Sequence, residues 1–166
     1  MFFILGKFMQ IFIMRHGQAS PTGISDAKRK LTELGALEVA VMAKWLSNKK
    51  PEFCQVLVSP FERAQQTANL MMSSISSSSA LSTLDFITPA GSARQVHDYI
   101  DGVCVAERCD ALLIVSHMPL VSYLVAELTV EQNTPIFQTA AIAEIDYDNK
   151  RMKGHLTRLI SPNDLC

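Results

Sequence analysis

The stretch Gln10-Ile11-Phe12-Ile13-Met14-Arg15-His16-Gly17 decides how the chain is organised. Its apolar run predicts a buried strand of a parallel sheet, and Gly17 lets the backbone turn sharply after that strand. In open α/β sheets, ligand chemistry lies just beyond the carboxyl ends of the strands. Arg15 and His16 therefore stand where such folds place their sites. A cation beside an imidazole suits an anionic substrate, usually phosphate, whereas a surface Arg-His pair ending a strand is the structural alternative.

Length and composition indicate one domain and no nucleic-acid or membrane partner. The 166 residues can bury a sizeable core in one domain. The net charge is -1, the pI is about 6.4, and no Lys/Arg run is present, which argues against both kinds of surface. The four cysteines, at positions 54, 104, 109 and 166, form no C-x-x-C pair. We therefore expect no zinc site or redox motif, reduced thiols and a cytoplasmic protein.

The first eight residues, MFFILGKF, are apolar but too short to span a bilayer. They also lack the basic start and the small-residue cleavage site of a secretory signal. The first strand begins naturally at Met9 or Gln10. We therefore expect residues 1–8 to be a start-site extension or a loose arm, with translation starting at Met9, and residues 9–166 to form the single domain.

A second strand is predicted over residues 54–59 (CQVLVS), followed by a helix over 61–72. Arg63 lies in the first turn of that helix, so it points toward the same sheet edge as Arg15. A solvated helix residue is the simpler interpretation of Arg63 alone. Two guanidinium groups together, however, suit the oxygens of a phosphoryl group.

The clearest buried strand is predicted over residues 111–116 (ALLIVS), with His117 directly after it and a helix over 120–128. A histidine at a strand end is often structural. Here, though, the pattern repeats that of His16 after the first strand. Three separate strand ends thus supply Arg15 with His16, Arg63 and His117, which favours one shared functional site.

The first helix is expected to start after Thr32, a plausible N-cap, with Glu33 favoured by the helix dipole. The polar segment before it, residues 19–30, predicts a surface loop near the site. Apolar residues recur in the helix at three- and four-residue steps and predict a buried stripe. That stripe comprises Leu34, Leu37, Val41 and Trp45, with Trp45 assigned to the core rather than to a ligand platform.

The remaining sequence completes an α/β pattern. We expect a flexible serine-rich connector over 73–82, a short edge strand over 84–89, a helix from 92 or 93 to about 105, and a hairpin of 141–147 with 152–160. His97 and His155 lie in these elements, away from the inferred site. The whole predicts a three-layer α/β/α sandwich whose central sheet is mainly parallel with an antiparallel edge.

These motifs together resemble the histidine phosphatase superfamily, also called the phosphoglycerate mutase-like family. The resemblance is carried by Arg15-His16-Gly17, residues 57–68 (LVSPFERAQQTA), Ser116-His117 and the segment 31–35 (LTELG), and it covers nearly the whole chain. The small size, with residues 115–121 and 124–128, is most similar to the SixA-type bacterial phosphohistidine phosphatases.

The resemblance implies a role for each candidate residue. His16 would be the nucleophile that becomes phosphorylated. Arg15 and Arg63 would hold the phosphoryl oxygens and offset their charge. His117 would donate to the same oxygens, which favours its charged form. The resemblance implies a hydrolase that needs neither a metal nor another cofactor, because the arginines take that place.

The resemblance also implies the substrate class. Longer members carry insertions that wall off a small-molecule pocket, and this chain has no long insertion that could form such a lid. An open site suits phosphohistidine on a carrier protein, such as the phosphotransfer domain of a hybrid sensor kinase or a phosphotransferase-system carrier. The alternatives are a phosphatase of small phosphomonoesters and an inactive module that binds phosphohistidine.

One position departs from the pattern of the longer members. They carry an acidic residue that protonates the leaving alcohol, and aligning through residues 88–91 (TPAG) places Phe86 there. Asp85 is adjacent, but strand-like alternation would point it to the other face. Asp85 acting as the acid remains the alternative.

Overall fold

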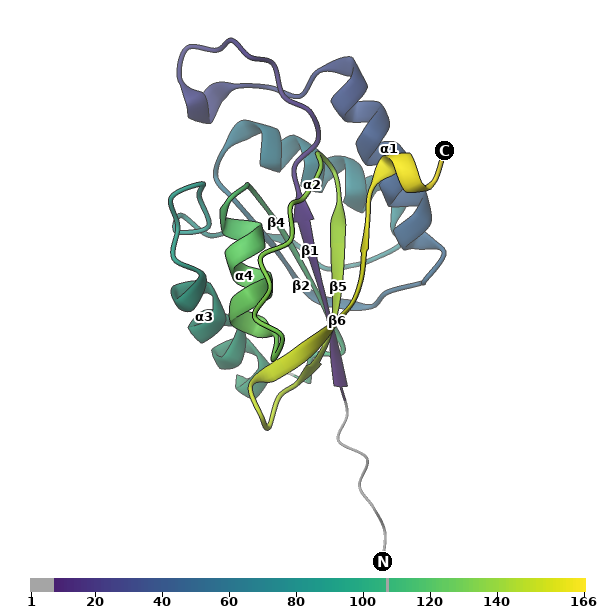
Figure 1. Cartoon of the computed structure of the whole chain (residues 1–166). Coiled ribbons are helices and arrows are strands. Elements are labelled where there is room, and N and C mark those ends of the chain that lie inside the picture. Colours follow the sequence, from purple (N-terminus) through teal and green to yellow (C-terminus); the bar gives the residue numbers. More distant parts are fainter. Residues whose placement is uncertain (1–7, 107) are drawn as a thin grey trace, which may run out of the picture.

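The computed structural model describes residues 8–106 and 108–166, and for residues 104–106 it describes the backbone alone. In this part of the chain the strands form one six-stranded sheet in the order β3-β2-β4-β1-β5-β6 (Figure 1). The strands are β1 (Phe8–Arg15), β2 (Phe53–Val58), β3 (Leu81–Thr83), β4 (Ala111–Ser116), β5 (Ile142–Asp148) and β6 (Lys153–Ile160). β1 to β4 are mutually parallel, whereas β5 and β6 run antiparallel along one edge. This confirms the predicted sheet.

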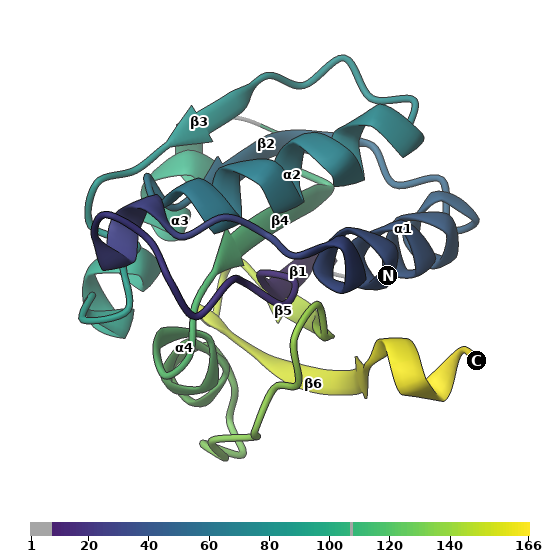
Figure 2. The same cartoon turned by 90° about the horizontal axis from the view of Figure 1, so that it is seen from above.

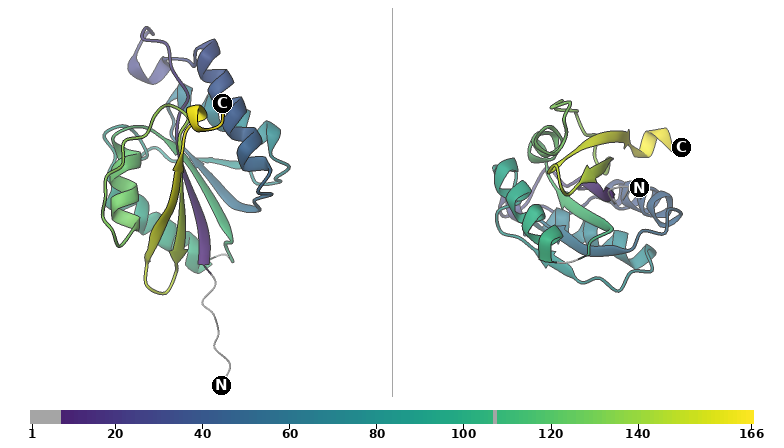
Figure 3. Two further views of the ribbon diagram at one scale, coloured as in Figure 1. Left: turned by 45° about the vertical axis from the view of Figure 1, so that its right-hand side comes forward. Right: turned by 90° about the horizontal axis from the view of Figure 1, so that it is seen from below.

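Helices cover both faces of the sheet, as Figures 2 and 3 show. The helices are α1 (Glu33–Ser47), α2 (Glu62–Ser74), α3 (Ala93–Ala106) and α4 (Leu120–Leu128), with short 3-10 turns η1 (Asp26–Lys28) and η2 (Pro162–Asp164). Side chains alternate along β1: Phe12 and Met14 pack with α1 and α2, while Ile11 and Ile13 pack with α3 and α4. The three-layer sandwich is therefore confirmed. Of the helices in the described residues, α2, α3 and α4 lie within two residues of their predicted bounds, and α1 starts directly after Thr32 as predicted.

The predicted buried stripe of α1 was wrong for Leu34 and Leu37, whereas Trp45 is half-buried against the core as predicted. Leu34 and Leu37 are 53% and 65% exposed. The buried face instead comprises Gly35, Val39, Met42, Ala43 and Leu46. The physical reason is the close packing of Gly35, since a Cβ there would lie 2.0 Å from the carbonyl oxygen of Gln18. Only a glycine-bearing face can approach the turn after β1, so that face turns inward and the more apolar one stays outside.

Two predictions on the segment after α2 also need correction. The edge strand β3 begins inside the segment predicted as a connector and ends at Thr83, before the strand predicted over 84–89. Residues Asp85 and Phe86 lie in a turn, so strand alternation does not decide where their side chains point. β3 forms despite its low apolar content because it pairs in parallel with β2, from Val56 with Leu81 to Val58 with Thr83.

The expectation of reduced thiols was wrong for one pair of cysteines. Cys54 and Cys109 form a disulfide with their Cα atoms 5.3 Å apart, while Cys166 is free and exposed. Parallel pairing of Phe53 with Ala111 brings the two cysteines together across 55 residues of sequence. The side chain of Cys104 lies outside the described part.

The chain start is described from Phe8 onward. Phe8 is the first residue of β1, one residue earlier than predicted, and pairs with Asp148 of β5. The rest of the predicted extension, residues 1–7, lies outside the described residues. Among the residues that the structure describes, no helix is long and apolar enough to cross a membrane.

Candidate active site

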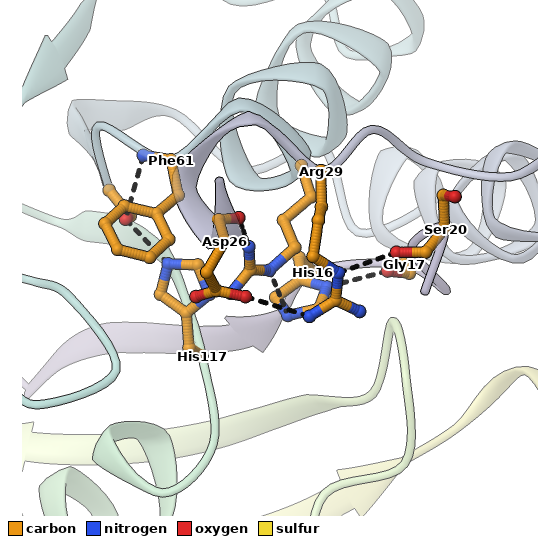
Figure 4. Close-up of polar contacts among 9 residues, drawn as sticks. His16, Gly17, Ser20, Asp26, Arg29, Phe61 and His117 are labelled. Carbon is orange, nitrogen blue, oxygen red and sulfur yellow. Dashed lines mark hydrogen bonds and ion pairs between the residues drawn. The ribbon is translucent and has the colours of Figure 1, made fainter. Parts of the chain in front are cut away.

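Three parallel strands bring the predicted site residues to one sheet edge. His16 follows β1, His117 follows β4, and Arg63 lies in the first turn of the helix after β2. The ring centroids of His16 and His117 are 5.0 Å apart (Figure 4). Arg63 Nε lies 3.2 Å from His16 Nε2. All three side chains are buried. The neighbouring order β2-β4-β1 produces this convergence, because carboxyl ends of adjacent parallel strands meet.

The His16 ring is held with one nitrogen available for attack. Its Nδ1 lies 2.7 Å from the carbonyl oxygen of Gly17, which can only accept, so Nδ1 carries the proton. Its Nε2 then holds a lone pair, to which Arg63 Nε donates. Burial, followed by the nearby Arg63, Arg15 and Arg29 charges, lowers the pKa of His16 to about 4, despite the opposing Gly17 hydrogen bond. His16 is therefore a neutral imidazole at neutral pH.

The turn after His16 packs directly on two helices. Gly17 N–H donates to Thr67 Oγ1 at 3.1 Å, and Thr67 Oγ1 donates to the carbonyl oxygen of Arg63 at 2.7 Å. A Cβ at Gly17 would lie 2.6 Å from the Gly35 carbonyl oxygen, so glycine is required by this close approach. Thr67 thus connects the turn after β1 to the backbone of Arg63, one helical turn earlier in α2.

His117 is fixed from its far side. Its Nε2 lies 2.6 Å from Ser59 Oγ, and the ring of Phe61 packs against it with centroids 5.0 Å apart. Ser59 Oγ can donate to Nε2 and accept the Phe61 N–H, which leaves the ring proton on Nδ1. That buried Nδ1 has no hydrogen-bond partner within the described ranges. A buried Nδ1–H donor that no protein group accepts is suited to bind an anion.

The charge of His117 in this anion-free site differs from the one expected with phosphate bound. Burial, followed by the His16 and Arg63 charges, lowers the pKa of His117 to about 2. His117 is therefore neutral without an anion beside it. A bound dianion would favour its charged form, since an opposite charge within a few ångströms raises the pKa of histidine.

Arg15, the last residue of β1, lies close enough to act by its charge on both His16 and His117. Its Nη1 donates to the Phe137 carbonyl oxygen at 2.7 Å, and its buried Nε has no hydrogen-bond partner among the described residues. Burial lowers the Arg15 pKa, while the charge of Glu38 raises it. Within residues 8–106 and 108–166, no group of three or more His, Cys, Asp or Glu is arranged to hold a metal ion. The positive charge near His16 comes from Arg15, Arg29 and Arg63.

The loop between β1 and α1 contributes two residues that sequence reasoning missed. Asp26 binds Arg63 twice, through its carbonyl oxygen to Nη1 at 2.6 Å and through Oδ2 to Nη2 at 3.2 Å. Arg29 Nη1 binds Asp26 Oδ1 at 2.9 Å, and Arg29 Nε donates to the Ser20 carbonyl oxygen. The loop was predicted near the site, but no sequence signal singled out its residues. It covers the outer side of Arg63, which the expectation of a lid-free site did not foresee.

The other candidates stay apart from this cluster. Phe86 packs against Tyr99 with ring centroids 5.8 Å apart, and Asp85 is exposed. His97 is buried between Glu127 and Tyr147, which its Nδ1 and Nε2 contact at 3.0 and 2.7 Å. His97 is therefore a buried residue that connects α3 to α4 and β5.

Comparison with known proteins gives a consistent family. Residues 11–86 match the histidine phosphatase superfamily (branch 1). Phosphohistidine phosphatase SixA of Escherichia coli is 42% identical over 140 residues, covering 84% of this chain and 86% of that protein. The SixA homolog of Haemophilus influenzae is 35% identical over 150 residues, covering 86% and 91%.

A solved structure supports the same assignment. The protein histidine phosphatase SixA complexed with tungstate superposes with a TM-score of 0.90 at 40% identity, covering 95% of this chain and all of the other. Sequence and architecture thus agree over most of both chains. The chain belongs to the histidine phosphatase superfamily.

Proposed function

We propose that the chain is a protein phosphohistidine phosphatase, a hydrolase that removes phosphate from a phosphorylated histidine carrier through a phospho-His16 intermediate. The carrying observation is the neutral Nε2 of His16, which faces the Arg63 guanidinium beside His117. Relatives named phosphohistidine phosphatases, at 42% and 35% identity, support the same activity.

In the first step, Nε2 of His16 forms a bond to phosphorus while the phosphorus–nitrogen bond of the substrate breaks. The electron pair of that bond stays on the substrate nitrogen. His16 keeps its Nδ1 proton on the Gly17 carbonyl and becomes a phosphoimidazolium. Arg63 Nε, which donated to Nε2, is then free to donate to a phosphoryl oxygen, and Arg15 and His117 offset charge on the others.

In the second step, a water oxygen attacks phosphorus and the bond to Nε2 breaks. The electron pair returns to Nε2, so His16 is again neutral with its proton on Nδ1. Both protons of the water stay on the released phosphate. Splitting one displacement into two in this way is the advantage of a covalent intermediate.

Phosphohistidine is favoured over alkyl phosphates by its leaving group. A phosphoimidazole protonated on its far nitrogen leaves as neutral imidazole, so no acid needs to contact the breaking bond. An alkoxide, by contrast, must be protonated as it departs. Phe86 occupies the aligned acid position and packs in an apolar contact with Tyr99, which fits a site without that acid.

The partner is proposed as a phosphotransfer domain of a hybrid sensor kinase or a phosphotransferase-system carrier. Both present phosphohistidine made from high-energy phosphoryl donors of the cytoplasm, where we place this protein. The Cys54–Cys109 disulfide is a pairing that cytosolic proteins seldom keep. Thiol titration of freshly extracted protein, without oxidation during purification, tests this placement: two fewer free thiols than after reduction would argue against it.

The activity is tested by incubating the purified protein with a phosphohistidine carrier and measuring phosphate release. We expect catalytic turnover that EDTA does not reduce, and transient labelling of the protein from a radiolabelled carrier. Stoichiometric capture without phosphate release would indicate a binding module instead. Faster release from an alkyl phosphate than from the carrier would indicate a phosphomonoesterase.

A further inference from the structure

We propose that Glu38 is a positioning residue that fixes the tautomer of His16 through the Gly17–Gln18 peptide group. The inference rests on the proposed function, because it concerns the nucleophile of that reaction. Glu38 lies on α1, and its hydrogen bonds connect it to His16 through backbone atoms, while its charge also acts on Arg15.

The connection consists of two hydrogen bonds on one peptide group. Glu38 Oε2 accepts the N–H of Gln18 at 2.8 Å. That N–H and the carbonyl of Gly17 belong to the same planar peptide unit. The Gly17 oxygen accepts Nδ1–H of His16 at 2.7 Å. A carboxylate, a peptide and an imidazole therefore form one continuous chain of hydrogen bonds, in which each bond polarises the next.

The carboxylate of Glu38 is itself held in place. Its Oε1 accepts the hydroxyl proton of Thr139 at 2.8 Å. The residue after Thr139 returns to the site, since the Ala140 N–H donates to the carbonyl oxygen of His16 at 3.0 Å. Glu38 thus connects α1 both to the turn after His16, through Gln18, and to the segment 139–140 that contacts His16. Its oxygen toward Gln18 therefore has a defined orientation.

The peptide also needs this partner for its orientation. Gly17 and Gly35 pack so closely that neither tolerates a Cβ, so the turn is pressed against α1. Thr67 accepts the Gly17 N–H and Thr32 donates to the Gln18 carbonyl, which holds the neighbouring peptide groups, whereas Glu38 is the partner of the Gln18 N–H. A rotation of the Gly17–Gln18 peptide would withdraw the carbonyl from His16. The Nδ1 proton would then lose its acceptor, and the form with the proton on Nε2, which lacks the lone pair needed for attack, would be opposed by the Arg63 Nε–H alone.

The negative charge of Glu38 differs in sign from the charged groups that surround His16. The groups that face His16 are Arg63 from α2, Arg15 from β1, Arg29 from the loop after η1, and the neutral His117 after β4. Positive charge develops on His16 as Nε2 bonds to phosphorus. A carboxylate acting through the peptide stabilises that charge, so Glu38 should affect kcat more than KM.

The test compares Glu38→Ala and Glu38→Gln, with Glu33→Gln as the matched control. Glu33 is an exposed carboxylate in the first turn of the same helix. A glutamine at position 38 can keep an acceptor on Gln18 N–H and a donor on Thr139. The tautomer of His16 is read by long-range ¹⁵N–¹H NMR correlations, and circular dichroism checks the fold.

In Glu38→Ala, we expect loss of the single Nδ1–H form of His16 and a fall in kcat of about 10- to 100-fold, as for other partners that orient an imidazole. Glu38→Gln should restore most of the Nδ1–H form, and Glu33→Gln should match the wild type. A folded Glu38→Ala protein with an unchanged His16 tautomer would overturn the proposal, whatever its activity. Because the NMR readout requires no turnover, its result is independent of whether the phosphatase assignment holds.

Discussion

The Nε–H of Arg63 donates to Nε2 of His16 across 3.2 Å, so the proposed nucleophile is occupied by the guanidinium meant to receive the phosphoryl group. A phosphoryl group must enter between these two atoms. In doing so it replaces a hydrogen bond between two enzyme groups by bonds to itself. The resting site is therefore arranged for an anion while its own residues satisfy one another.

Replacing His16 by alanine should abolish turnover. Removal of a covalent catalyst should lower kcat/KM by about a thousandfold or more, roughly 4 kcal/mol. A radiolabelled phosphohistidine carrier should leave no label on the variant. His155→Ala, which changes an exposed histidine on β6 paired with Glu131, is the control and should retain activity. Near-normal activity of His16→Ala would refute the covalent route.

Replacing Asp26 by asparagine should tighten oxyanion binding. The Asp26 carboxylate shares Arg63 Nη2 with any bound anion, and its own charge repels that anion. Because Asp26 is exposed while Arg63 is buried, removal of the Asp26 charge predicts tungstate affinity about three- to tenfold higher, measured by calorimetry. Asp98→Asn, on the exposed Arg94–Asp98 pair, is the control. Unchanged or weaker binding would show that Asp26 does not compete with the anion.

The His16 imidazole should titrate far below an ordinary histidine. Burial and the surrounding arginine charges lower its pKa to about 4. NMR titration should therefore show a midpoint near that value, with the signal assigned by its loss in His16→Gln. Saturating tungstate should raise the midpoint, because a nearby anion favours the protonated ring. A midpoint near 6.5, the ordinary value, would contradict this account.

The neutral His117 should make the fold sensitive to mild acid. Its pKa is lowered from 6.5 to about 2, so below pH 6.5 the unfolded chain binds a proton that the native state does not. The free energy of unfolding must then fall as the pH is lowered from about 6.5. In His117→Gln this fall should be shallower. The free energy of unfolding is measured by chemical denaturation at pH 7.5 and pH 5. Loss of the Ser59 hydrogen bond lowers it at both pH values, so the difference between the two reports the titration of His117.

Carrier activity should not depend on Asp85. Because imidazole leaves without an acid at the breaking bond, Asp85→Asn should retain kcat/KM for a phosphohistidine carrier within about twofold. The wild type should strongly prefer that carrier to an alkyl phosphate. Comparable kcat/KM values for the two substrates, or a collapse of carrier activity in Asp85→Asn, would show that the acid is present.

The sequence by itself determined the sheet apart from its edge strand β3, the positions of the helices and the convergence of His16, Arg63 and His117. Strands such as 111–116 are continuous apolar runs that have no stable alternative to burial, and the residue after each one must leave at the carboxyl edge. Strand order then needs only to keep β1, β4 and β2 adjacent for those residues to meet.

Only the tertiary structure decided which face of α1 is buried and what surrounds the site residues. Both faces of α1 are apolar, so periodicity could not choose between them, and the contact of Gly35 with Gln18 made the choice. The bond from Asp26 to Arg63 joins residues 37 positions apart, and the Cys54–Cys109 disulfide joins residues 55 apart. Such pairs depend on where loops and strand starts come together in space, which no local pattern in the sequence encodes.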